Sequence, residues 1–156
     1  MPAPSALSAT IEVEVMFHDL DPANIVWHGH YARFLAQARD TLMSRLGYSH
    51  TEMADSGILW PVTEMKLRYL QPARLGQRLR VTATIVEHEE RLKIAYEIRD
   101  AGSGRRLTRA STVQVPVQMP EGRLLFAAPA ALRARLDAAL SAAPTAPPAA
   151  DAGQAR

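Results

Sequence analysis

The alternation of apolar and polar positions changes its period along the chain, and each period predicts one kind of element. Residues 11–17 alternate, which predicts a strand with every second side chain, up to Phe17, on one face. Residues 29–47 repeat every three to four positions, which predicts an amphipathic helix with Gly29 as its N-cap and Gly47 as its stop. The apolar face of this helix consists of Tyr31, Phe34, Leu35, Ala38, Leu42 and Leu46.

Four more alternating segments follow a loop or short helix, and short breaks that suit hairpins separate them. They cover residues 60–70, 78–86, 91–99 and 106–119, and Pro116 marks an edge or a bulge in the last one. One helix cannot cover both faces of five strands. The pattern therefore predicts an α+β fold, a curved five-stranded antiparallel sheet wrapped around one long central helix. An exposed edge strand invites pairing between chains, so we expect a homodimer or homotetramer.

The 156 residues suggest a single domain with short flexible ends. We expect a flexible N-terminus over residues 1–9 and a folded domain over residues 10–140. Residues 141–156 are rich in Ala and Pro without apolar periodicity, which predicts a disordered tail.

Composition and charge exclude several classes of function. Apolar residues make up 47% and charged residues 22% of the chain, as in ordinary globular proteins. No apolar run is long enough to span a membrane, and the first residues do not resemble a secretion signal, so we expect a cytoplasmic protein. The formal charge of +2 does not favour nucleic acid. The absence of cysteine excludes disulfides, thiolate chemistry and cysteine-ligated metals.

Candidate chemistry gathers in "DLDPANIVWHGHY", residues 19–31, at the entrance of the predicted helix. Asp21 is the candidate catalytic carboxylate, and Asp19 is expected to hold the loop by hydrogen bonds. His28 is a candidate for a functional side chain or for a neutral polar residue at the helix start. His28 and His30 could share a metal only on an irregular segment, and no metalloprotease-type motif follows, so we expect no metal site.

The segment "D-x-D-P-A-x-I-V-W-x-x-x-Y" before a long helix resembles hot-dog-fold acyl-CoA thioesterases of the 4-hydroxybenzoyl-CoA thioesterase type. The resemblance continues through "WPVTEMKLRYLQPARLGQRLRV" and covers Ile11 to Met119. It implies that Asp21 is the catalytic carboxylate and that the backbone N–H of His28 polarises the thioester carbonyl. Phe17 stands where one branch often has a tyrosine, and Asn24 stands where the family often has glycine. "FHDLDP…VWHGHY" also resembles thioesterases found beside aryl-polyene biosynthesis genes.

The resemblance implies a thioesterase that converts acyl-CoA or acyl-carrier-protein thioesters into free acid and thiol. No cofactor is expected, because CoA or phosphopantetheine is part of the substrate. Asp21 would act as nucleophile or as general base, and the helix N-terminus would polarise the carbonyl. Arg91 and Lys93 would contact the CoA phosphates across a dimer interface. The candidate substrate-binding residues are Trp27, Gly29, Tyr31, Trp60, Arg91 and Lys93.

Two other functions remain open at the level of sequence. A hot-dog dehydratase would act on 3-hydroxyacyl thioesters, although "DLDPANIVW" disfavours it. A non-catalytic acyl-thioester binding protein would need no carboxylate at residue 21. The products separate the three functions, because they are free thiol, enoyl thioester or nothing.

Overall fold

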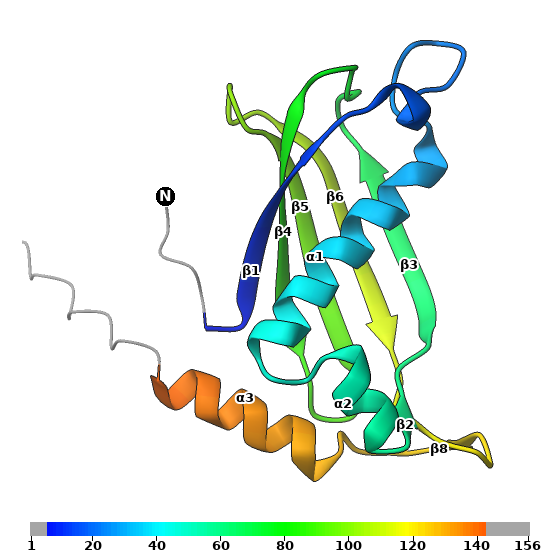
Figure 1. The fold of residues 1–156 in the computed structure, drawn as a ribbon, viewed down its shortest axis with the longest axis vertical. Coiled ribbons are helices and arrows are strands. Elements are labelled where there is room, and N and C mark those ends of the chain that lie inside the picture. Colours follow the sequence, from blue (N-terminus) through cyan, green and yellow to red (C-terminus); the bar gives the residue numbers. More distant parts are fainter. Residues whose placement is uncertain (1–5, 143–156) are drawn as a thin grey trace, which may run out of the picture.

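The computed structural model describes residues 6–142, and its elements follow the order that the hydrophobic pattern predicts (Figure 1). The strands of this part of the chain are β1 (Ser8–Glu14), β2 (Ile58–Leu59), β3 (Val62–Tyr69), β4 (Arg78–Glu87), β5 (Leu92–Asp100), β6 (Arg106–Gln114), β7 (Val117–Gln118) and β8 (Arg123–Leu124). Its helices are the 3-10 turns η1 (Phe17–Asp19) and η2 (His28–His30) and the α-helices α1 (Tyr31–Arg45), α2 (His50–Asp55) and α3 (Ala130–Ala142).

The main sheet has the order β1-β4-β5-β6-β3, and every neighbouring pair is antiparallel. Helix α1 lies along one face of this sheet (Figure 1). The predicted α+β hot-dog arrangement is therefore confirmed. Strand β3 forms one edge of the sheet, and seven of its eight residues are exposed.

The core lies between α1 and the neighbouring strands β4 and β5. Every residue of the predicted helix face is buried, and Met43 joins it. The inward residues of β4 and β5 are buried as predicted, and they are Leu79, Val81, Ala83, Ile85, Leu92, Ile94, Tyr96 and Ile98. Full burial of each large aliphatic side chain contributes about 1.5–3 kcal/mol, so this layer fixes α1 on the sheet.

The start of α1 differs from the sequence prediction, whereas its end does not. The helix begins at Tyr31 after the 3-10 turn of η2, so the predicted N-cap at Gly29 is wrong. The residue before the helix is His30, which already has helical backbone angles. At the other end Gly47 has a φ of 70°, and its N–H donates to the Ser44 carbonyl at 3.0 Å. Glycine adopts this left-handed conformation without steric cost, so it ends the helix as predicted.

Both ends of the folded part extend further than the periodicity predicts. Strand β1 begins at Ser8, before the expected start at residue 10, because Ser8 pairs with Thr84 of β4. It also ends at Glu14, so the prediction that Phe17 continues the strand is wrong, and Phe17 is 80% exposed. Helix α3 continues to Ala142, and the rest of the predicted tail lies outside the described residues.

The last predicted strand divides at Pro116. Strand β6 ends before this proline, and the chain then forms a second, three-stranded sheet of order β2-β7-β8, which the pattern does not predict. Helix α3 follows and buries Leu132 and Leu136. Among residues 6–142, no helix combines the length and the apolar character needed to cross a bilayer.

Candidate active site

The segment before α1 folds back on itself and presents Asp21 at a tight turn. Leu20 pairs with Val26, and the Asp21 N–H donates to the Ile25 carbonyl at 2.9 Å. Asn24 closes the turn with a φ of 58°, as expected for a residue that tolerates the left-handed region. One carboxylate oxygen of Asp21 accepts the Ala23 N–H at 2.8 Å. The other oxygen accepts no hydrogen bond from residues 6–142 and is free for a ligand.

A pocket of about 350 Å³ opens beside this turn, between the start of α1 and the end of β3. The residues that line it are Asp21, Ile25, Val26, His28, Tyr31, Tyr69, Leu70, Gln71 and Pro72. The structure thus brings together Asp21, His28 and Tyr31 of the predicted site. Burial raises the pKa of Tyr31, so its hydroxyl stays protonated near neutral pH.

The helix start offers hydrogen-bond donors next to this pocket. Within the described part of the chain, the backbone N–H groups of His28 and Gly29 donate no hydrogen bond. The His28 carbonyl accepts the Tyr69 hydroxyl at 2.7 Å, which ties the turn to the end of β3. Free N–H groups and the positive end of the helix dipole favour a developing negative charge. The pocket can therefore hold a carbonyl oxygen near donors and a carboxylate near its carbon.

Tyr69 is a site residue that the sequence analysis missed. Its ring centroid lies 5.1 Å from that of Tyr31, and it shares one face of β3 with Met65 and Leu67. The sequence feature that could have pointed to Tyr69 is its position at the end of a predicted alternating strand. That signal does not show which segment the end of the strand approaches.

Asp19 has the structural role that its position predicts. It is fully buried, its side chain accepts the Met16 N–H at 2.9 Å, and it forms an ion pair with Arg33. His30 Nδ1 lies 3.3 Å from the same carboxylate. Burial would raise the pKa of Asp19, but the Met16 N–H and the Arg33 guanidinium outweigh it and hold the pKa below its ordinary value. Asp19 therefore anchors the turn that carries Asp21.

Trp27 and Gly29 lie beside the pocket but do not line it. The Trp27 ring packs against the two flanking histidines, with ring centroids 5.1 Å from His28 and 5.4 Å from His30. A Cβ at Gly29 would lie 2.4 Å from this ring. A side chain at residue 29 would therefore displace the indole.

The remaining candidate residues lie far from Asp21 within one chain. Trp60 is buried in a second cavity near α2, where its indole N–H donates to the Tyr48 hydroxyl at 3.1 Å. Arg91 pairs with Glu87 at 2.8 Å at the β4–β5 turn, and Lys93 follows on β5. This turn is at the end of β4 opposite to the Asp21 loop. Contact of these two cations with CoA stays a prediction.

Histidines and carboxylates near the site do not form a metal centre. No group of three or more such side chains in residues 6–142 has the spacing to hold a metal ion. The Asp19 carboxylate is instead contacted by His18, His30 and Arg33.

Comparison with known proteins gives the same family as the motif. The chain matches the thioesterase-like superfamily over residues 15–148. It is 32% identical over 108 residues to a 1,4-dihydroxy-2-naphthoyl-CoA hydrolase of Thermosynechococcus vestitus, which covers 68% of this chain and 73% of that protein. The crystal structure of a 1,4-dihydroxy-2-naphthoyl-CoA thioesterase from Synechocystis superposes with a TM-score of 0.75 at 26% identity, covering 86% of this chain and 96% of the other.

A substituted form of 4-hydroxybenzoyl-CoA thioesterase, in complex with 4-hydroxybenzoyl-CoA, shares the fold with a TM-score of 0.74 at 21% identity, over 83% of this chain and 99% of that chain. The fold is the hot-dog fold of this family. The chain belongs to the thioesterase-like superfamily. The chain is therefore a thioesterase. This assignment disfavours the two alternative functions, a dehydratase and a non-catalytic binding protein.

Proposed function

We propose that this protein hydrolyses acyl-CoA thioesters in the pocket beside Asp21. One observation carries the proposal, namely that Asp21, with a carboxylate oxygen that has no partner, and His28, with a free N–H group, line the same pocket. Thioester hydrolysis needs both groups, because the carbonyl carbon must be attacked while its oxygen gains negative charge.

Two mechanisms fit the same arrangement. In the first, Asp21 attacks the carbonyl carbon, the C–S bond breaks, and the resulting anhydride is hydrolysed by water. In the second, Asp21 removes a proton from a water that attacks the carbonyl directly, and the thiolate leaves. In both, the backbone N–H of His28 stabilises the oxyanion. One such donor is worth roughly 2.7–4 kcal/mol in other enzymes.

The relatives support an acyl-CoA substrate with an aromatic acyl group. Two of the proteins named above act on 1,4-dihydroxy-2-naphthoyl-CoA according to their names. Tyr31 and Tyr69 present aromatic rings to the pocket, and rings of this kind pack well against a planar acyl group. An acyl-carrier-protein substrate would use the same chemistry and is the second candidate.

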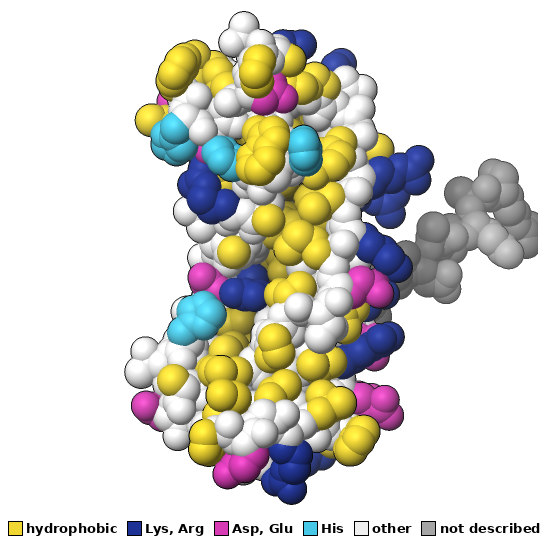
Figure 2. Space-filling model, turned by 90° about the vertical axis from the view of Figure 1, so that its right-hand side faces the viewer, with side chains coloured by type: hydrophobic (Ala, Val, Ile, Leu, Met, Phe, Trp, Pro, Cys, Tyr) yellow, Lys and Arg dark blue, Asp and Glu magenta, His cyan; other side chains and the backbone are white. Residues whose placement is uncertain are grey.

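A homodimer formed through β3 completes this proposal. Strand β3 is an edge strand, and Figure 2 shows hydrophobic side chains along the face that bears this edge. Exposed apolar residues on or next to β3 are Leu59, Val62, Met65, Tyr69 and Leu70. A twofold axis through the middle of β3 would pair it with its copy in antiparallel fashion and cover these side chains.

The test of the proposal is the Asp21→Asn variant, assayed for thiol release from benzoyl-CoA, 4-hydroxybenzoyl-CoA and linear acyl-CoA substrates. Asparagine keeps the oxygen that accepts the Ala23 N–H, so the turn should persist. The carboxylate charge and its nucleophilicity are lost. We expect kcat/KM to fall about 10³-fold or more, with the melting temperature unchanged. Hydrolysis at the parent rate would refute the role of Asp21, and no thiol release by the parent would refute the function.

A further inference from the structure

A second cavity, of about 310 Å³, lies between the last turns of α1, helix α2 and the chain that enters β3. Its deep walls are apolar and are made by Met43, Met53 and Trp60, all at most 7% exposed. Methionine side chains adapt to the shape of what they contact. The cavity can therefore take a planar or branched apolar group.

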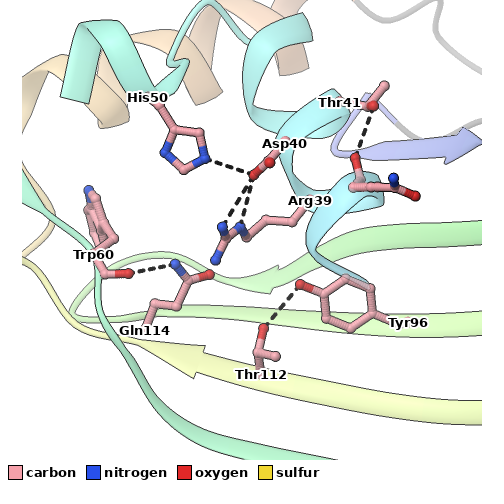
Figure 3. A network of polar contacts seen from close by, with 9 residues as sticks. Arg39, Asp40, Thr41, His50, Trp60, Tyr96, Thr112 and Gln114 are labelled. Carbon is pink, nitrogen blue, oxygen red and sulfur yellow. Dashed lines mark hydrogen bonds and ion pairs between the residues drawn. The ribbon is translucent and has the colours of Figure 1, made fainter. Parts of the chain in front are cut away.

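One polar side chain of the cavity lacks a partner. Gln114 is 2% exposed, and its Nε2 donates to the Trp60 carbonyl at 2.8 Å (Figure 3). This bond fixes the orientation of the amide. Its Oε1 is buried and accepts no hydrogen bond within residues 6–142. A buried acceptor without a partner is unfavourable, so its presence in a cavity indicates a ligand that donates to it.

A donor lies at the same end of the cavity. Arg39 lines it, and its Nε and Nη2 contact a single Asp40 oxygen at 3.4 and 3.2 Å. His50 contacts the same oxygen at 3.0 Å, as Figure 3 shows. The Nη1 of Arg39 donates no hydrogen bond to the part of the chain that is described. The polar end thus combines an unused acceptor with an unused donor.

A hydroxyl group matches this pair best. It can donate to Gln114 Oε1 and accept from Arg39, whereas a carboxylate has no proton to donate and a methyl group can do neither. We propose that this cavity receives the distal end of the acyl group and that Gln114 selects acyl groups with a hydroxyl at that end. The proposal rests on the proposed thioesterase function.

The direction of β3 explains how this cavity serves the Asp21 pocket. Pro61, directly before β3, lines the cavity, and Tyr69, the last residue of β3, lines the Asp21 pocket. The strand is about 26 Å long at 3.3 Å per residue, too far for a small acyl group within one chain. Antiparallel pairing of β3 with its copy brings the start of one strand beside the end of the other. The cavity of one subunit would then adjoin the Asp21 pocket of its partner.

The test compares kcat/KM within matched pairs, namely 4-hydroxybenzoyl-CoA with benzoyl-CoA and 6-hydroxy-2-naphthoyl-CoA with 2-naphthoyl-CoA. For at least one pair, the parent protein should prefer the hydroxylated member about tenfold or more, because the analogue without a hydroxyl leaves Gln114 unpaired. Gln114→Leu should remove this preference, so that the two members of a pair have similar kcat/KM values. The matched control is Gln118→Leu, since Gln118 lies on β7 and does not line the cavity, and it should keep the preference.

Equal rates within both pairs for the parent would overturn the proposal, and so would a preference that survives in Gln114→Leu. Circular dichroism shows whether this variant folds; if it does not, Arg39→Met replaces it and should reduce the same preference. If the parent hydrolyses none of the four thioesters, the proposed function fails instead. In that case, isothermal calorimetry measures the Kd of each thioester for the parent and for Gln114→Leu. The parent should bind the hydroxylated member of a pair more tightly than the unsubstituted one, and Gln114→Leu should bind both equally.

Discussion

Replacement of Asp19 by asparagine tests whether the two aspartates of the turn have different roles. The Asp19 carboxylate is fully buried, accepts the Met16 N–H at 2.9 Å and forms an ion pair with Arg33. Asparagine has one acceptor oxygen, so it can keep only one of these interactions, and its NH₂ group faces a donor in place of the other.

The size of the effect follows from these contacts. A hydrogen bond to a charged group contributes about 1.5–3 kcal/mol. In Asp19→Asn, one of the two interactions, with the Met16 N–H or with Arg33, is lost. The other is weakened because its acceptor no longer carries a charge. Arg33 is 46% exposed and can recover water, which limits the penalty for its unpaired charge. We expect a loss of about 2–3 kcal/mol in the free energy of unfolding. For a domain of this size that corresponds to a melting temperature lower by about 5–10 °C.

The dependence on pH gives the prediction a second, independent measure. Because the pKa of Asp19 lies below its ordinary value of 3.8, its ionised form stabilises the fold at neutral pH. This stabilisation is lost as the pH falls below about 4, towards the lowered pKa of the folded protein. Thermal unfolding followed by circular dichroism should therefore show a difference between parent and Asp19→Asn at pH 7 that shrinks below pH 4.

Equal melting temperatures at pH 7 would refute the assignment of Asp19 as the anchor of the turn. A difference that persists unchanged in acid would show that the loss comes from packing rather than from the charge. Thiol release should separate the two aspartates, since Asp19→Asn should retain more activity than Asp21→Asn.

Three further predictions address the neighbours of the pocket. His28→Ala should lower kcat/KM by about tenfold, less than Asp21→Asn, because the backbone N–H and the carbonyl that accepts Tyr69 both remain; inactivity equal to that of Asp21→Asn would contradict this. Gly29→Ala should displace the Trp27 ring, which lies 2.4 Å from the new Cβ, and should change tryptophan emission and activity with little change in melting temperature; unchanged emission would exclude the predicted movement. Light scattering at micromolar concentration should give a dimer mass for the parent and a lower mass for Met65→Asp, since like charges would meet near the twofold axis; a monomeric parent would refute the cavity shared between subunits.

Local periodicity determined the main elements of this protein. The apolar face of α1 and the inward residues of β4 and β5 repeat within a few positions, so the sequence alone predicted which side chains are buried. The turn before α1 is equally local. Asp21, Asn24 and His28 lie within eight positions of one another, and their motif predicted both the turn and the family.

Contacts between distant segments were decided only by the tertiary structure. Tyr69 reaches the His28 carbonyl across 41 positions, and Gln114 reaches the Trp60 carbonyl across 54. The sequence also does not show that Trp60 lines a cavity separate from the Asp21 pocket of the same chain. Alternation shows which face of a strand is apolar, but the strand order decides what that face meets. Pairing of β3 with β6 at the sheet edge sets both the pocket and the exposed edge, and no pattern within β3 specifies that neighbour.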